Sequence, residues 1–208
     1  MKMEVIRMNK NELEKLHRII DSYIAPRTSS SLSKLLNEPV EHRLTKVTDV
    51  EISKMEDIIK TVPQEEMYAV YLKGEGDVHL GMLIFLKEND AMKLASRLLG
   101  VKTMNKLDAL GRSSISEVGN ILMAGSFLNA LSDGTGFQVT GSVPGFAIES
   151  ARAVLQYPAS DIASTTDIIV TADAVLHATQ SDITVRILIM LGENEAKKLI
   201  DSDKRVSK

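Results

Sequence analysis

The stretch from Gly111 to Thr135 constrains the fold of this chain most, because a helical period of 3.6 residues sorts it into two different faces. One face carries apolar or small residues that suit a protein core, namely Ile115, Val118, Leu122 and Gly125. The other face carries a hydroxyl, a carboxylate, a carboxamide and a small residue on successive turns, namely Ser113, Glu117, Asn120 and Ala124. The stretch therefore predicts one long helix with a buried side and an unusual polar side.

The polar side of this helix has two interpretations. Glu117 and Asn120 are three positions apart, so a helix places them on one face. Every amphipathic helix has polar residues on its solvent side, and in the first interpretation the pair has no further role. In the second, the face is pressed against a partner, where the amide orients a water molecule and the carboxylate pairs with a cation. Spacing alone does not choose between them.

Length and composition indicate an ordinary globular protein. With 208 residues, 44% of them apolar and 25% charged, the chain suits a single domain over 1–208, or two small halves that share a core. A net charge of -3 without a basic block argues against a nucleic-acid partner. The absence of cysteine excludes disulfides, thiolate metal sites and a thiol nucleophile.

The apolar segments are too short to cross a membrane, and charges are scattered through the first fifteen residues, unlike a signal peptide. We therefore expect a soluble cytoplasmic protein with no membrane partner.

The first half of the chain alternates helices and strands. The pattern predicts a helix over 11–36 that Pro26 kinks or breaks, and then a strand over 40–52. Ser53 is a candidate N-cap for a short helix over 54–61. Two strands over 67–73 and 78–87 form a hairpin, and Asn89 or Asp90 caps a helix that stops at Gly100.

The second half repeats this order. We expect a helix over about 107–132, a strand over 137–148, an irregular stretch through Pro158, strands over 167–177 and 183–191, and a helix over 193–200. A shift of 99 residues sets Val139 on Val40, so we interpret 11–100 and 107–200 as pseudo-repeats. The predicted fold is α+β, with two pseudo-symmetric halves sharing a mainly antiparallel sheet and two long helices packed on one face.

The polar face resembles a known signature. Ser113, Glu117 and Asn120, followed by Pro144, are similar to the Asp/Ser-x-x-x-Glu-x-x-Asn…Pro pattern of the CheC, CheX and FliY family of chemotaxis phosphatases. The words EVGNI at 117–121 and NALS at 129–132 resemble the active helix of that family. CheC proteins have about this length and two such halves, so the resemblance covers the whole chain.

The resemblance implies hydrolysis of the aspartyl phosphate on the response regulator CheY. By this similarity, Asn120 is expected to orient the attacking water and Glu117 to anchor the regulator's lysine. The chain needs no cofactor of its own, because Mg²⁺ is expected on CheY. CheC proteins also bind the deamidase CheD, and the switch protein FliM has a related fold without the pair. A non-catalytic module that binds CheY or CheD is thus the alternative.

Two further residues receive supporting roles from the resemblance. Ser113 is expected to support the helix surface, although a local cap is the simpler role for a serine near a helix start. Pro144 is expected to shape the end of the following strand, or to be an ordinary turn proline. The 23 residues between Asn120 and Pro144, 121–143, exceed the family pattern by one, which a helix bulge or a longer turn would absorb.

The first half lacks an equivalent pair. Many CheC proteins carry a second Glu/Asn pair there, but a shift of 99 residues gives Arg18 and Asp21, and a slip of one residue gives Ile19 and Ser22. Neither register restores the pair, and an aspartate has no amide to donate. We therefore expect one working site, in the second half.

Overall fold

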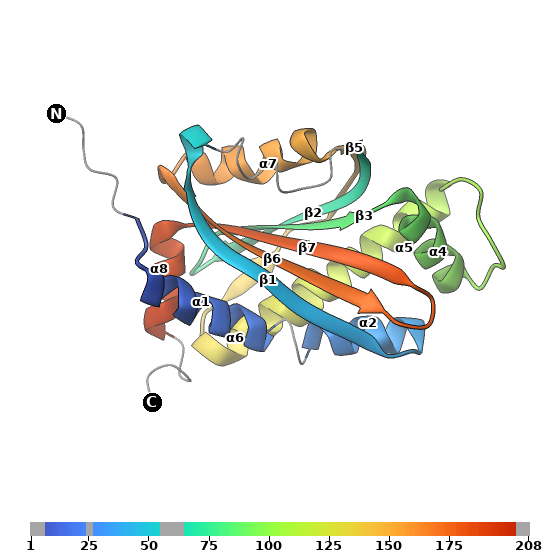
Figure 1. Cartoon of the computed structure of the whole chain (residues 1–208), viewed down its shortest axis with the longest axis horizontal. Helices are drawn as coiled ribbons and strands as arrows, with labels where there is room; N and C mark the ends of the chain where they lie inside the picture. The colour runs from blue at the N-terminus through green and yellow to red at the C-terminus, as the bar shows by residue number, and fades with distance from the viewer. Residues whose placement is uncertain (1–6, 24–26, 55–64, 203–208) are drawn as a thin grey trace.

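The computed structural model describes residues 7–23, 27–54 and 65–202. Within these residues one seven-stranded sheet runs through the molecule, and all of its strand pairs are antiparallel (Figure 1). The strand order is β1, β6, β7, β3, β2, and then β4 and β5 pair with successive parts of β2. The strands are β1 Val40–Glu51, β2 Glu66–Gly76, β3 Leu80–Leu86, β4 Val139–Gly141, β5 Gly145–Ser150, β6 Ile168–Ala178 and β7 Ile183–Gly192.

Helices cover the two faces of the sheet unequally (Figure 1). On one face, α7 (Ala151–Ala163) packs over a hydrophobic cluster that includes Phe85 and Leu155. A short 3₁₀ turn, η2 (Ile52–Lys54), follows β1. A larger cluster fills the space between the other face and the remaining helices. These helices are α1 Lys10–Tyr23, α2 Ser29–Leu36, α4 Glu88–Leu99, α5 Ala109–Asn120, η3 Ile121–Leu128, α6 Asn129–Thr135 and α8 Glu193–Ser202. The fold class is the predicted one.

The sequences of the strands follow this coverage. All seven residues of β3 are buried, because the strand lies in the middle of the sheet with helices on both faces. In β6 the residues are buried without interruption as far as Ala172, and beyond it they alternate between buried and half-buried. The alternation begins where α7 no longer covers the strand, so one face there meets solvent.

The two halves exchange strands across the centre of the sheet. β3 of the first half pairs with β7 of the second, which places a pseudo-two-fold axis between them. On either side, β1 pairs with β6 of the other half and β5 pairs with β2 of the other half. Each half therefore lacks a complete sheet alone, as expected of halves that share a core. A duplication remains our interpretation of this symmetry.

Two differences from the predicted elements concern the second half. The strand over 137–148 is two strands, β4 and β5, with a break at 142–144. The stretch through Pro158 is helical, because Ser150 accepts a hydrogen bond from the backbone N–H of Ala153 (3.3 Å) and caps α7. Pro158 is tolerated inside α7 because its ring packs closely against Gly81 of β3. The contact is so close that a Cβ at Gly81 would lie 2.7 Å from Cβ of Pro158.

In the first half, most of the predicted strands and helices lie where expected, and the exceptions are local. The helix α4 begins at Glu88, so Asn89 and Asp90 lie inside its first turn and neither is its N-cap. Pro26 and nearly all of the short helix predicted over 54–61 lie outside the described residues. None of the described helices is long and apolar enough to span a membrane.

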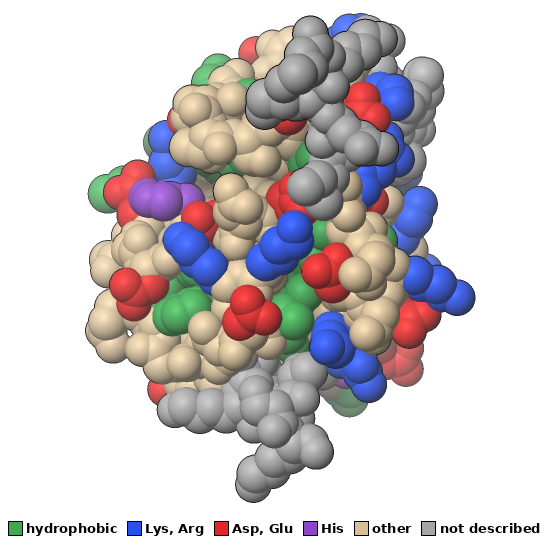
Figure 2. Space-filling view, turned by 90° about the vertical axis from the view of Figure 1, so that its left-hand side faces the viewer, with side chains coloured by type: hydrophobic (Ala, Val, Ile, Leu, Met, Phe, Trp, Pro, Cys, Tyr) green, Lys and Arg blue, Asp and Glu red, His purple; other side chains and the backbone are tan. Residues whose placement is uncertain are grey.

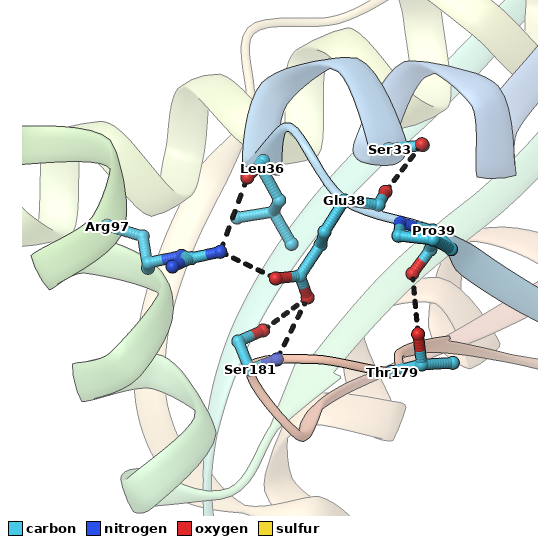
Figure 3. A network of polar contacts seen from close by, with 7 residues as sticks. All are labelled: Ser33, Leu36, Glu38, Pro39, Arg97, Thr179 and Ser181. Carbon is cyan, nitrogen blue, oxygen red and sulfur yellow. Dashed lines mark hydrogen bonds and ion pairs between the residues drawn. The ribbon is translucent and has the colours of Figure 1, made fainter.

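A buried carboxylate ties the first half to the second at the end of α2 (Figure 3). The side chain of Glu38 has no solvent exposure and accepts hydrogen bonds from the N–H (3.1 Å) and hydroxyl (2.6 Å) of Ser181, in the turn between β6 and β7. Arg97 of α4 donates to the second carboxylate oxygen (2.5 Å). Burial would raise the pKa of Glu38, but these bonds and the charge of Arg97 outweigh it and lower the pKa.

Candidate active site

The helix that carries the candidate residues begins with a side-chain cap. Oδ1 of Asp108 accepts a hydrogen bond from the backbone N–H of Gly111 (2.8 Å), and α5 then runs to Asn120. Its buried stripe includes Ile115 and Val118, as predicted, and also Gly119. A Cβ at Gly119 would lie 2.6 Å from Cγ1 of Val70 on β2, so the glycine lets the helix approach the sheet closely. The close approach positions the last turn of α5, where Asn120 lies.

The helix changes character directly after Asn120. Residues Ile121–Leu128 form a π-helical stretch, η3, in which each turn holds one residue more than an α-helix. Ser126 Oγ lies 2.8 Å from the carbonyl oxygen of Ile121 and 2.7 Å from Ser31 Oγ, so it can donate to the first and accept from the second. The wider turns rotate later residues, so Gly125 is exposed. Our prediction that Gly125 lies on the buried face is therefore wrong.

The polar face of α5 is available for a partner. Ser113 and Glu117 are exposed and Asn120 is half-buried. Among the described residues, no hydrogen bond or ion pair engages these three side chains. The N-cap of the helix is Asp108, so Ser113 does not have the capping role. The face thus presents a hydroxyl, an acceptor and an amide whose hydrogen bonds remain to be made.

The break between β4 and β5 lies beside this face. A Cβ at Gly141 would lie 2.9 Å from Cβ of Ala124, one turn after Asn120, so β4 contacts the helix there. Ser142 bonds to Lys73 of β2 in both directions, through its N–H (2.8 Å) and its Oγ (3.0 Å). Pro144 follows two residues later, half-buried, and has no N–H with which to continue the ladder. Pro144 therefore ends the β4 pairing at a fixed place next to α5.

The structure decides which first-half residues correspond to the pair. Asn9 Oδ1 accepts from the N–H of Glu12 (3.0 Å) as Asp108 does from Gly111, and 108 − 9 gives an offset of 99. In the other register Ile19 would have to be exposed, but its side chain is buried. Arg18 and Asp21 therefore occupy the positions of Glu117 and Asn120.

The first-half positions differ in chemistry as well as in residue type. Arg18 is exposed, and Oδ1 of Asp21 lies 3.9 Å from Nε2 of His42 on β1. The face there has a cation where α5 has a carboxylate, and a carboxylate where α5 has an amide.

One cleft elsewhere contains charged groups that already have partners. On the α7 side, a cleft of about 240 Å³ holds Asp161, which accepts from the hydroxyl of Tyr71 (2.8 Å) and pairs with Nζ of Lys73 (2.6 Å). Burial, together with Asp161, raises the pKa of Tyr71. Burial would also raise the pKa of Asp161, but Lys73 and Tyr71 outweigh it and lower that pKa. These three groups are a structural tie between β2 and α7.

The described residues offer no metal site, and the face drawn in Figure 2 carries mixed charge. The described residues contain no group of three His, Cys, Asp or Glu side chains that could hold a metal ion. Figure 2 shows one end of the molecule, where Lys and Arg side chains are interspersed with Asp and Glu. The polar face of α5 remains the best candidate for chemistry, and it is an open helix surface, so a partner must bring the reacting group.

Comparison with known proteins shows which family this segment resembles. A model of the CheC-like family matches residues 110–148, which include Ser113, Glu117, Asn120 and Pro144. The CheY-P phosphatase CheC of Bacillus subtilis (strain 168) is 26% identical over 160 residues, 74% of each chain. The segment that carries the candidate residues is therefore similar to the CheC-like family.

Several solved structures share the fold. FliY of Thermotoga maritima has a TM-score of 0.73 at 15% identity, covering 97% of this chain and 100% of that one. The FliM middle domain of H. pylori has a TM-score of 0.65 at 13% identity, covering 94% and 99%. The CheX chain of the Borrelia burgdorferi CheX–CheY–BeF3–Mg complex has a TM-score of 0.56 at 15% identity, covering 87% and 99%.

Sequence reasoning missed the residues that hold the candidate site in place. Gly119 and Gly141 set how closely α5 and β4 approach their neighbours, and Asp108 starts the helix. A glycine inside an otherwise regular helical pattern, next to Asn120, was a signal of close packing. The partners of both glycines lie far away in the sequence, so their role could not be identified without the fold.

Proposed function

We propose that this chain is a chemotaxis phosphatase that hydrolyses the aspartyl phosphate of phosphorylated CheY. The observation that carries the proposal is the pair of Glu117 and Asn120, one turn apart on an outward face of α5 and free of bonds within the described residues. The name of the Bacillus relative supports the same activity, and a scaffold that only binds would not need this pair. Because the site lies on a protein that acts on another cytoplasmic protein, we also propose a cytoplasmic location.

The proposed chemistry consists of positioning. An acyl phosphate is already activated, so the step needs a water molecule held in line with the phosphorus atom. Asn120 accepts a hydrogen bond from this water and is neutral, so it does not repel the phosphoryl oxygens. The water oxygen bonds to phosphorus as the bond to the aspartyl oxygen breaks. One water proton stays on the released phosphate, the other passes to solvent, and the regulator regains its carboxylate.

Glu117 has a binding role in this proposal. One turn from Asn120, its carboxylate pairs with a lysine of the regulator and sets the depth to which the amide enters the partner's site. Ser113 supports this surface one turn earlier, and Pro144 holds the neighbouring loop against it. Mg²⁺ is supplied by the regulator and neutralises charge on the phosphoryl group.

The test is the release of phosphate from a cognate CheY-phosphate with Mg²⁺. The wild type should accelerate decay, and Asn120→Ala should remove on the order of 100-fold of that acceleration or more. Glu117→Gln should weaken binding of the regulator. The matched control is Asn129→Ala, which deletes an exposed amide nine residues later whose Nδ2 donates to the carbonyl of Gly125 (2.9 Å). If wild type and variants all leave the regulator's own decay unchanged, the chain is not this phosphatase.

A second candidate function is a non-catalytic module that binds CheY, the deamidase CheD or a partner in the flagellar switch. Two observations support it. The fold is shared with FliM, and in the first half Arg18 and Asp21 stand where a second Glu/Asn pair would be. The same assay separates the two, because the module predicts binding without any acceleration of phosphate release.

A further inference from the structure

Two exposed apolar side chains bracket the polar face of α5. Among the described residues the large hydrophobic side chains that are exposed are Val101, Leu110, Val143 and Tyr157. A single exposed apolar residue is normal on a protein surface, so its position decides whether it has a role. Leu110 (61% exposed) lies in the first turn of α5, and Val143 (90% exposed) lies in the break between β4 and β5.

Leu110 lies on the same line of the helix as Glu117. The two residues are seven positions apart within the regular α-helical part of α5, so their directions differ by only about 20°. A rise of 1.5 Å per residue puts them roughly 10 Å apart along the axis. A partner that contacts Glu117 and extends toward the start of α5 therefore meets the Leu110 side chain.

Val143 marks the other end of the face. Its loop is fixed by Ser142, which bonds to Lys73, and by Gly141, which lies against Ala124 one turn beyond Asn120. The following Pro144 restricts Val143 to an extended backbone. The side chain is thus presented to solvent from a fixed position, rather than from a loose loop.

The first half has no exposed apolar side chain at either equivalent position. Subtracting the offset of 99 from 110 gives Asn11, which is polar, and subtracting it from 143 gives Leu44, which is apolar but buried in the core. Exposed apolar residues are therefore found at these positions in the half that has the Glu/Asn pair and are missing there in the half that lacks it. A general requirement of the fold would have kept them in both.

We propose that Leu110 and Val143 are docking residues for the phosphorylated response regulator, placed on either side of its phosphorylation site; this inference rests on the proposed function. In this arrangement the regulator's phosphorylated site and its lysine face Asn120 and Glu117, and apolar side chains of the regulator around that site cover Leu110 and Val143. Apolar contacts are equal in the ground and transition states, so they raise affinity without changing the rate of the bound complex. The polar pair and the apolar residues thus divide catalysis and affinity between them.

The test uses the full chain with Leu110→Asp and Val143→Asp. The matched control is Tyr157→Asp, because Tyr157 lies on α7, across the sheet, and is as exposed (62%) as Leu110. Binding is measured with a cognate CheY carrying beryllofluoride and Mg²⁺, and turnover with CheY-phosphate. We expect Leu110→Asp and Val143→Asp each to raise the Kd and KM at least tenfold, with kcat within twofold of wild type. The conservative variant Leu110→Met should keep the Kd of wild type. Tyr157→Asp should change neither.

The outcomes separate this inference from the proposed function. If the wild type binds the beryllofluoride form but does not accelerate phosphate release, the phosphatase proposal fails while the two aspartate variants still test docking. If Asn120→Ala removes activity but Leu110→Asp and Val143→Asp leave the Kd within twofold, the docking inference is overturned and the phosphatase proposal stands. A loss of kcat at unchanged KM in these variants would also overturn docking.

Discussion

The helices α1 and α5 occupy equivalent places in the two halves and differ in what they present. Both begin with a side-chain cap, Asn9 or Asp108, and both bury apolar residues at matching positions, such as Leu16 and Ile115. On the outer face the first half has Arg18 and Asp21 where the second has Glu117 and Asn120. The comparison teaches that the shared fold preserves the caps and the buried stripe, while the exposed residues are free to differ.

The outer strands differ at one matching position. β1 is continuous over twelve residues, with an irregularity in its pairing between Leu44 and Lys46. In the second half the strand is interrupted at 142–144, and the offset of 99 puts Thr45 opposite Pro144. One half therefore accommodates an extra residue as a bulge, and the other uses the same place to turn a loop toward the helix.

In each half a carboxylate fixes the corner, the short segment that joins a helix to the strand after it. The carboxylate belongs to the corner in the first half and to a neighbouring turn in the second. In the first half Glu38, at the corner itself, accepts from Ser181 in the β6–β7 turn (Figure 3). In the second half Asp77, in the β2–β3 turn, accepts from the N–H of Gln138 at the corner (2.8 Å). Glu38 is buried and Asp77 is exposed, so the first tie is the stronger one.

The largest expected effect concerns a transplanted pair. Adding Arg18→Glu and Asp21→Asn to Asn120→Ala should leave phosphatase activity lower than wild type by on the order of 100-fold. The reason is that α1 has no loop like 142–144 beside it, and none of its described side chains is an exposed apolar one. Phosphate release from CheY-phosphate measures the effect. Recovery to within tenfold of wild type would show that two residues suffice and that the surrounding structure is dispensable.

The second expected effect compares the two corner ties. Glu38→Ala leaves the N–H and hydroxyl of Ser181 without their acceptor and should lower the free energy of unfolding by about 1–3 kcal/mol. Asp77→Ala should cost less, about 0.5 kcal/mol, because water replaces an exposed acceptor. Urea denaturation of both variants checks the difference. Equal losses would contradict the assignment of Glu38 as the stronger tie.

The same tie predicts a pH dependence. The pKa of Glu38 is lowered in the folded state, so its ionised form stabilises the fold at pH values above its ordinary range, near 4.5. As the pH falls through the folded pKa, the carboxylate takes up a proton and this stabilisation is lost. The difference in unfolding free energy between wild type and Glu38→Gln should therefore shrink below about pH 4, measured by urea denaturation across pH. A difference that grows on acidification would contradict it.

Alanine substitutions at two glycines of one helical run should change the stability of the fold by smaller amounts, and in opposite directions from each other. Gly119→Ala drives a methyl group to 2.6 Å from Val70 and should destabilise the fold by about 1–2 kcal/mol. At Gly125 the nearest atom is 3.9 Å from the new Cβ, so Gly125→Ala should stabilise by roughly 0.5 kcal/mol. Thermal denaturation compares them. The same sign for both would show that α5 can move away from β2.

The smallest expected effect is the control in the first half. Asp21→Ala should change phosphate release by less than twofold, since Asp21 sits where the amide would be and supplies no donor to a water molecule. The measurement is the same CheY-phosphate assay. A large loss would mean that the first half carries a second site of different chemistry.

Local patterns predicted most elements because their signals lie within a few residues. The hairpin of β2 and β3, the stop of α4 at Gly100 with its positive φ, and the buried stripe of α5 all follow from neighbouring residues. The prediction failed at α7, because the packing of Pro158 on Gly81 outweighs the usual effect of proline in a helix. It failed at Gly125, because the π-helical stretch changes the period on which the prediction rested.

The sequence by itself determined the α+β class, the helix that bears the candidate pair, and the choice of Glu117, Asn120, Ser113 and Pro144 as residues to test. The class and the helix rest on periodicity, which the chain encodes locally, and the four residues rest on the resemblance to the CheC, CheX and FliY signature. Only the tertiary structure decided that Arg18 and Asp21 are their counterparts, and that Gly119 and Gly141 bring α5 and the 142–144 loop together. These features depend on residues 17 to 99 positions apart, and only the fold relates such residues to one another.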